Sequence, residues 1–241
     1  MVDHRAASDF LHRAVVESAV FALRPDYRVL LLAVDGIALA PSDADSEALL
    51  AAAEDAAARA LADSAVEDLP HVADWREAYR AFGAKPQRTR NSAEALLRRA
   101  ATGLPRVNRL TDVYNAVSVL HQLPLGGEDL SRYSGSPRLI RATGAEAFDT
   151  VSDGHPVLEH PDPGEVVWCD NVGVTCRRWN WRPARRTQLT PETTAALFIL
   201  DALAPISDQD LNAAADDLIA HLVPPGTQPS VTRRMISAEG A

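Results

Sequence analysis

The chain has 241 residues, which is enough for one large domain or two small ones with a buried core. Its composition, 46% hydrophobic and 24% charged, is typical of a globular protein, and it has no apolar run of the roughly 20 residues needed to cross a bilayer. The formal net charge of -9 argues against a protein that coats nucleic acid, and the N-terminus lacks a basic-then-apolar signal pattern. We therefore expect a cytoplasmic protein with no membrane and no DNA partner.

The N-terminal half is predicted to be mostly helical. Residues 8–23 follow an amphipathic pattern that Arg24-Pro25-Asp26 interrupts, and the apolar residues that follow predict a buried strand from about Arg28 to Ala38. Caps, prolines and apolar spacing then predict four helices, which run from Pro41-Ser42-Asp43 to Leu61 or Asp63, from Pro70 to Phe82, from Asn91 to Thr102, and over 109–122.

The C-terminal half changes to the period of two that is typical of strands. Short strands are predicted near 138–142, 147–151, 165–169 and 173–178, whereas Pro124-Leu125-Gly126-Gly127 predicts a tight turn. Thr190-Pro191 is predicted to begin one helix, and Ser207 with Asp210 caps a last helix to about Leu222. We therefore expect one α+β domain over 25–225, a helical extension over 1–24 and a disordered tail over 226–241.

Positive charge gathers in the middle of the chain. From Arg76 to Arg141 there are twelve basic and five acidic residues, and the segments on either side are acidic. The densest basic segment comes later, where Arg177-Arg178-Trp179-Asn180-Trp181-Arg182 is followed by Thr187. Guanidinium groups bind phosphate or carboxylate, and indole rings stack on bases or cations. This cluster therefore predicts an anionic, flat ligand at the end of a hairpin. The alternative is that it only pins the hairpin by salt bridges and indole packing.

A second polar cluster lies on the helix predicted over 109–122. Asn108, Thr111, Asp112 and Asn115 recur at spacings of three and four, so they share one stripe of the helix. Such a stripe either lines a polar pocket or forms an N-terminal cap with a solvated face. The glycine pair Gly126-Gly127 follows directly and would let the backbone approach a ligand with free N–H groups.

The usual catalytic devices are missing from the sequence. There is no Gly-x-Ser-x-Gly elbow and no His-Glu-x-x-His motif. The segment from His155 to His160 is proline-rich and predicts a surface loop, and Cys169 and Cys176 are predicted to be core thiols. We expect no metal and no cofactor. Any hydrolysis would have to use water held by polar side chains and backbone donors.

Several segments, taken in order, resemble the B3/B4 domain, which is known as the editing module of the phenylalanyl-tRNA synthetase β-subunit and also occurs in freestanding proteins. The segments are Trp75–Gly83, Ser92–Arg99, Leu104–Asn108, Asp112–Ser118, Pro124–Leu130 and Arg177–Arg182 with Arg186-Thr187. The resemblance is closest to the freestanding branch and covers roughly Arg28 to Leu222. It implies an α+β fold with a mixed sheet, several packed helices and a pocket for an amino acid esterified to the 3′ end of tRNA.

The resemblance also implies an activity, the hydrolysis of a mischarged aminoacyl ester by a positioned water, with tRNA as the partner. The residues expected to hold the ammonium group and the water are Asn108, Asp112, Asn115 and Asn180. The residues expected to bind the rest of the substrate are Arg106, Thr111, Gly126, Gly127, Arg177, Arg178, Trp179, Trp181, Arg182 and Thr187. Trp179 or Trp181 would stack on the terminal adenine.

One position departs from the synthetase pattern. The synthetase domain has Pro-Leu-His-Ala-Phe-Asp after the helix, with its histidine in the editing site, and this chain has Gly126 at the matching position. That departure and the overall acidity favour the competing hypothesis. In it, the same fold binds an amino acid, a nucleotide or a translation-factor partner without chemistry.

Overall fold

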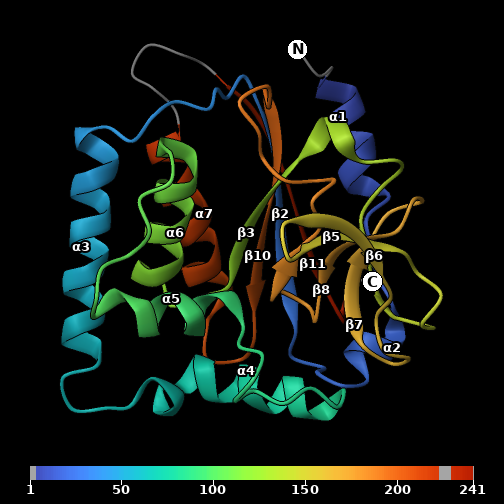
Figure 1. Cartoon of the computed structure of the whole chain (residues 1–241), viewed down its shortest axis with the longest axis horizontal. Coiled ribbons are helices and arrows are strands. Elements are labelled where there is room, and N and C mark those ends of the chain that lie inside the picture. Colours follow the sequence, from blue (N-terminus) through green and yellow to red (C-terminus); the bar gives the residue numbers. More distant parts are fainter. Residues whose placement is uncertain (1–3, 223–228, 241) are drawn as a thin grey trace.

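The computed structural model describes residues 4–222 and 229–240 (Figure 1). Seven α-helices occur in this part of the chain: α1 (His4–His12), α2 (Ser18–Phe21), α3 (Ala44–Ala60), α4 (Pro70–Ala81), α5 (Ser92–Ala100), α6 (Arg109–Leu120) and α7 (Asp208–Leu222). Two short 3-10 helices, at Val66–Asp68 and Leu130–Arg132, complete the helical elements. None of the helices within the described ranges is long and apolar enough to span a membrane.

A four-stranded antiparallel sheet forms the centre of the molecule. Its order is β11 (Ser230–Ser237), β2 (Arg28–Asp35), β10 (Ala195–Ala202) and β3 (Leu125–Asp129). Alternate residues of β2 enter two different cores, Leu31 on one face and Leu32 on the other. Because both faces are covered, β2 and β10 can be apolar along nearly their whole length. Helices α6 and α7 lie on one side of these strands, and strands β7 and β8 lie on the other (Figure 1).

The second sheet contains both parallel and antiparallel pairs. Its order is β1 (Val15–Val16), β4 (Arg138–Arg141), β7 (Val166–Cys169), β8 (Val174–Arg177) and β9 (Arg182–Pro183), with β1 parallel to β4. A separate hairpin of β5 (Phe148–Ser152) and β6 (His155–Glu159) stands in front of it (Figure 1). The α+β class with a mixed sheet, predicted from the sequence, is confirmed.

The helices α3 to α7 and the strands β4, β5, β7 and β8 lie where the sequence predicts them, within a few residues. The helix expected over 8–23 is instead two short helices separated by β1. The reason is that the backbone of Val15 and Glu17 pairs with the edge of β4, donating N–H groups to Pro137 and Leu139 carbonyls at 3.1 and 3.0 Å. Strand β6 replaces the loop expected around His155.

Three further expectations are wrong. The predicted turn over Pro124–Gly127 is the start of edge strand β3, because its backbone pairs with β10. The helix expected to begin at Thr190-Pro191 is strand β10, whose eight residues are all buried. In the tail expected to be disordered, residues 230–237 form β11, which pairs with β2 along its whole length. Residues 223–228 lie outside the described ranges.

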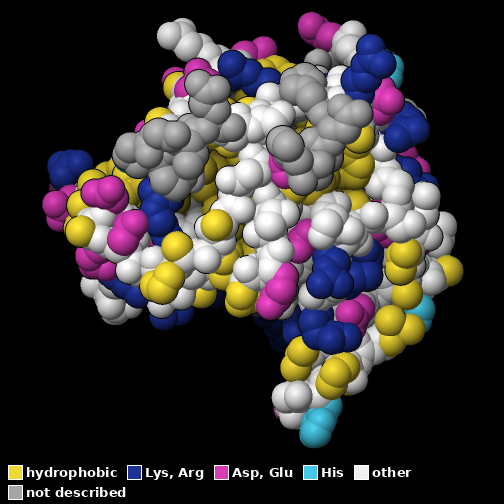
Figure 2. Space-filling model, turned by 90° about the horizontal axis from the view of Figure 1, so that it is seen from above, with side chains coloured by type: hydrophobic (Ala, Val, Ile, Leu, Met, Phe, Trp, Pro, Cys, Tyr) yellow, Lys and Arg dark blue, Asp and Glu magenta, His cyan; other side chains and the backbone are white. Residues whose placement is uncertain are grey.

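The basic middle of the chain is largely neutralised by the acidic segments beside it. Arg106 pairs with Glu47 and Glu54, and Arg109 pairs with Asp43. On the face shown in Figure 2, basic and acidic side chains are accordingly interspersed rather than gathered in one block. Because most arginines have a partner, an unpaired cationic side chain is an exception in this molecule and can indicate a binding site for an anion.

Candidate functional site

A cavity of about 280 Å³ lies between helices α5 and α6, strand β3 and the loop that joins β8 to β9. We call it the acid pocket, for the two buried carboxylates described below. The loop and helix α6 are thus two walls of one cavity. Its wall is largely apolar, with Leu96, Leu125, Trp168, Trp181 and Ile199 among the lining residues, and its polar lining includes Ser92, Asn115, Glu128, Asn180 and Asp201. An apolar cavity with few polar groups is the common form of a small-molecule site.

Asp201 is the first buried carboxylate of the acid pocket. It comes from β10, where it interrupts an apolar run, and its side chain is 2% exposed. Tyr27 donates its hydroxyl to Asp201 at 2.6 Å, and Asn180 Nδ2 donates at 3.2 Å. Burial raises the pKa of Asp201 to about 7, and the two hydrogen bonds only partly oppose this. Near neutral pH this carboxylate can therefore accept a proton.

Asn180 is held from both ends of its amide group. Its Oδ1 accepts a hydrogen bond from the Tyr79 hydroxyl at 2.9 Å, while Nδ2 donates to Asp201. An amide NH₂ carries two hydrogens, so one N–H of Asn180, which lines the pocket, has no partner within the described residues. The preceding residues Arg178 and Trp179 have φ angles of 47° and 67°, a left-handed conformation that costs about 1–2 kcal/mol per residue. This tight turn places Asn180 over the pocket.

Glu128 is the second buried carboxylate, and it lies on β3. The Tyr133 hydroxyl donates to Glu128 Oε2 at 2.7 Å, and burial raises the pKa of Glu128 above its ordinary value. No arginine, lysine or histidine is among the residues that line the acid pocket in the described chain. Two buried carboxylates without a cation make the pocket a site for a positively charged group.

Several donors around the acid pocket, Trp179 Nε1 included, lack a partner within the described residues. The others are the Asn115 amide, Ser92 Oγ, Trp168 Nε1 and the backbone N–H of Gly127. The Gly127 N–H is free because backbone groups alternate in direction along a strand. Pro124 O accepts from Asp201 N of β10, whereas Asp129 N donates away from β10 to Thr187 O. The backbone N–H groups of the odd-numbered residues of β3, Gly127 included, therefore point away from β10. Buried polar groups are nearly always paired, so these donors point to water or a ligand in the pocket.

The structure places the start of α6 outside the pocket. Asn108 caps the helix by accepting from Thr111 N at 2.9 Å. Asp112 accepts from Val107 N at 2.8 Å and from the Ser42 hydroxyl, and Arg106 is taken up by its two glutamates. Of the predicted stripe, only Asn115 lines the cavity. The other residues form the helix cap that the sequence allowed as the alternative.

The arginine and tryptophan cluster divides between core and surface. Arg177 donates to buried Glu165 at 2.8 and 2.6 Å, and Trp179 is fully buried against Trp75 and Tyr27 at ring centroid distances of 5.2 and 4.9 Å. Trp179 is among the residues that line the acid pocket, but it is 0% exposed, so of the two tryptophans Trp181 is the one with accessible surface for stacking on a base. Thr187 is likewise fully buried and does not line the pocket.

The outer part of the cluster surrounds Trp181. The guanidinium carbon of Arg178 lies 4.5 Å from the Trp181 ring centroid, and that of Arg182 lies 6.0 Å from it. Trp181 and the glycines Gly126 and Gly127 line the acid pocket. Arg178 and Arg182 do not line it.

Sequence reasoning missed Asp201, Glu128 and Tyr79. The signal for Asp201 was present, because a carboxylate inside the run Ala195–Ala202 must find partners if the run is buried. The signal was overlooked because the segment after Thr190-Pro191 was predicted to be a helix. A helix would have placed Asp201 on one of several faces, whereas a buried strand leaves no solvated side.

The profile of the B3/4 domain family matches residues 74–237 of the chain. Among solved structures, the chain is similar to an N-terminal fragment of the phenylalanyl-tRNA synthetase beta-subunit from Pyrococcus horikoshii, at 11% sequence identity and a TM-score of 0.45. The similarity covers 90% of this chain and 49% of that one, so the chain spans about half the length of the fragment. No curated protein sequence matches the chain significantly.

Proposed function

The chain belongs to the B3/4 domain family, and from this premise we propose that its acid pocket binds and hydrolyses an aminoacyl ester at the 3′ end of tRNA. The family membership confirms the resemblance predicted from the sequence. The activity rests on one observation, the presence of two buried carboxylates and no basic side chain in the lining of the acid pocket within the described chain.

The charge of the pocket selects between a free and an esterified amino acid. A free amino acid carries an ammonium and a carboxylate, and its carboxylate would meet Glu128 and Asp201 with no cation among the lining residues. Burying such an unpaired charge costs several kcal/mol. An aminoacyl ester carries only the ammonium, which the two carboxylates attract. The pocket therefore favours the ester over the free amino acid.

The polar groups of the pocket fit hydrolysis without a covalent intermediate. Asp201 accepts a proton from water as the water oxygen bonds to the ester carbonyl carbon. The N–H of Gly127 and the amide of Asn115 are the donors for the oxyanion that forms. The ester C–O bond then breaks, and Asp201 returns the proton to the departing 3′-oxygen. Asn180, held by Tyr79, keeps the Asp201 carboxylate in place.

The test uses tRNAs charged with a panel of amino acids and follows loss of the ester bond. We expect the wild-type chain to accelerate release of at least one amino acid. Asp201→Asn is expected to slow that reaction about 100-fold or more, since general base catalysis contributes roughly 10²–10⁴. The wild-type rate should also fall as pH drops below about 7, where Asp201 takes up its proton, and this dependence should disappear in the variant.

A comparison variant separates the acid pocket from the helix cap. Asp112→Asn alters a carboxylate that is as buried as Asp201 but lies outside the cavity, so it should lower stability more than the rate per folded molecule. Equal loss of rate in the two variants would contradict the assignment. If no charged tRNA is hydrolysed faster than in buffer, the chain is a binding protein on the same fold, as the departure at Gly126 favours.

A further inference from the structure

A second cavity, of about 430 Å³, lies on the other side of the β8–β9 loop. We call it the basic groove; its lining includes Lys85, Arg88 and Arg178, with Glu165 and Asp162. We propose that the basic groove binds the phosphodiester backbone of a single-stranded RNA 3′ end whose terminal ester occupies the acid pocket. This inference rests on the proposed function and adds to it the place where the nucleic acid is held.

The groove presents cationic groups that have no partner. Lys85 and Arg88 are exposed, and neither side chain forms an ion pair or hydrogen bond within the described part of the chain. This is unusual here, because most arginines are paired. The loop that carries them is fixed, since the Lys85 carbonyl accepts from Arg88 N at 2.8 Å and from Thr89 N at 3.0 Å. Two free cations are thus held three residues apart on one ordered turn.

The acidic residues of the groove do not cancel this charge. Glu165 is already bound by Arg177 at 2.6 Å, and it also accepts from the backbone N–H of Arg178 at 3.1 Å. Arg178 Nε also lies 3.7 Å from Glu165 Oε2, so Arg177 and Arg178 share this carboxylate. Asp162 then remains as one carboxylate against Lys85 and Arg88. The groove therefore keeps a net positive charge on a molecule whose net charge is -9. Binding of a polyanion should depend on this local charge and be sensitive to salt.

The groove and the acid pocket share a wall. Arg178 lines the groove and covers the ring of Trp181, which lines the acid pocket. The backbone also joins them, because Ser92 N donates to Asn180 O at 3.2 Å and so ties the end of the basic loop to the hairpin. A strand that enters the acid pocket with its terminal ester would pass Trp181 and place its next phosphates against the groove.

The experiment measures binding of a fluorescent single-stranded RNA that ends in the tRNA 3′ sequence, by anisotropy over a range of salt concentrations. For single strands the slope of log K against log salt changes by about 0.7 for each phosphate contact. The double variant Lys85→Ala, Arg88→Ala should therefore bind more weakly at low salt and lose about 1.4 from the slope. An unchanged affinity and slope would overturn the proposal, and so would displacement of the RNA by an equal concentration of inorganic phosphate.

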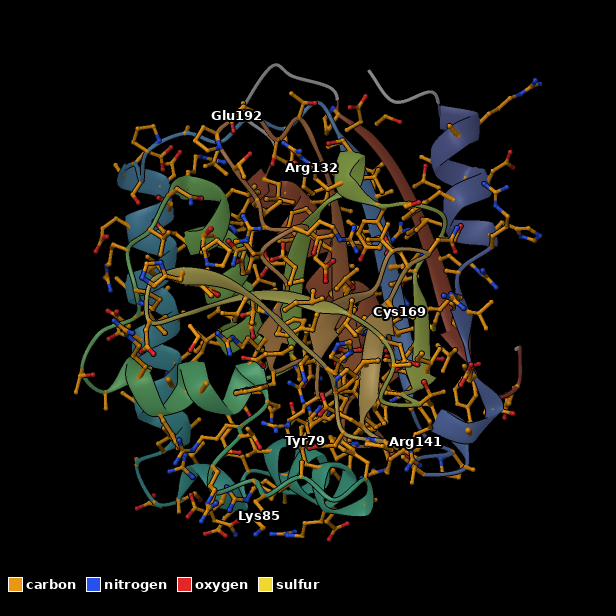
Figure 3. The ribbon with its side chains drawn as sticks, turned by 45° about the vertical axis from the view of Figure 1, so that its right-hand side comes forward. Tyr79, Lys85, Arg132, Arg141, Cys169 and Glu192 are labelled. Atoms are coloured by element: carbon orange, nitrogen blue, oxygen red, sulfur yellow. The ribbon has the colours of Figure 1, made fainter. Side chains whose placement is uncertain are left out.

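The matched control is Arg132→Ala. Arg132 is also exposed, and Figure 3 places it toward the opposite end of the molecule from Lys85. Its removal should leave the RNA affinity and the slope as they are. If Arg132→Ala weakens binding as much as the double variant, the effect is one of net charge and the groove is not the site.

A second readout distinguishes failure of the groove from failure of the proposed function. An aminoacyl ester of adenosine has no phosphodiester for the groove to bind, so the double variant should hydrolyse it as the wild type does while showing a raised KM for charged tRNA. Equal KM values for charged tRNA would refute the groove and leave the hydrolase intact. If no ester is hydrolysed at all, the proposed function fails, and the RNA anisotropy still decides the groove.

Discussion

At the scale of single residues, the acid pocket keeps a carboxylate where the fold would be more stable without its charge. Asp201 is surrounded by apolar residues of β10, and its two donors, Tyr27 and Asn180, are neutral. By contrast, the similarly buried Glu165 is neutralised by Arg177. The two acids differ in their partners rather than in their burial. Glu165 has a structural role, whereas Asp201 remains available for a proton or a cationic ligand.

The free-energy cost of burying the charged form of Asp201 predicts how the stability of the fold depends on pH. The folded pKa of Asp201 is about 7, against 3.8 in an unfolded chain, so between these values the folded state holds more protons. Stability therefore falls as pH rises from about 4 to 7, by up to about 4 kcal/mol for a shift of roughly three units. Asp201→Asn should remove this part of the dependence and gain stability relative to wild type at pH 8. The free energy of unfolding of both proteins is measured in urea at pH 5 and at pH 8. If it changes between the two pH values by the same amount in the wild type and in the variant, the assignment is contradicted.

At the scale of elements, strand β3 explains why two adjacent glycines have different roles. A Cβ at Gly126 would meet nothing within 4 Å, and this residue is paired with Ile199 on the pocket side of the sheet. A Cβ at Gly127 would lie 3.0 Å from Phe198 Cε1 and 3.1 Å from Leu189 Cδ1, on the opposite face. The pair therefore leaves open space on one face and allows close packing on the other.

The matched variants Gly126→Val and Gly127→Ala test this division. Gly126→Val should leave the midpoint of urea unfolding nearly unchanged, because β-branched residues suit a strand, but it should fill part of the acid pocket and reduce ester hydrolysis. Gly127→Ala should lower the free energy of unfolding by about 1–3 kcal/mol, as overpacking of a core does. Similar losses of stability in both variants would show that the two faces of β3 are not as described.

The same elements show what the sequence can and cannot predict. Helices α3, α5 and α6 carry their own caps at Asp43, Asn91 and Asn108, so local sequence is enough to place them. Strand β10 follows a Thr-Pro pair that is typical of a helix start, and only its pairing with β2 reveals its structure. The same holds for the site, because the partners of Asp201 come from segments 21 and 174 residues away. Local patterns predicted Asn115, Asn180 and Trp181 as site residues. They predicted Asp112 and Trp179 equally, and only tertiary contacts show that Asp112 belongs to the helix cap and that Trp179 is fully buried.

At the scale of the whole molecule, strand β11 closes the central sheet. It pairs with β2 over Ser230–Ser237, more than 190 residues away in sequence, and covers an edge that would otherwise expose unpaired backbone groups. It also anchors the C-terminal end of helix α1. Arg234 Nη1 donates to the carbonyls of Leu11, His12 and Ala14 at 2.6, 2.5 and 2.9 Å. The two ends of the described chain are thus held by one strand.

Truncation after residue 229 tests this role against the disordered tail expected from the sequence. Loss of β11 removes a ladder of eight paired residues and leaves β2 as an apolar edge, so we expect a large fall in the urea midpoint and self-association in size-exclusion chromatography. Arg234→Ala keeps the strand and removes only the anchor of α1, so it should cost less and leave the protein monodisperse. A disordered tail would have no such effect. If the truncated chain unfolds at the wild-type urea concentration without associating, β11 does not hold the sheet together, and the acid pocket must be supported by the remaining three strands alone.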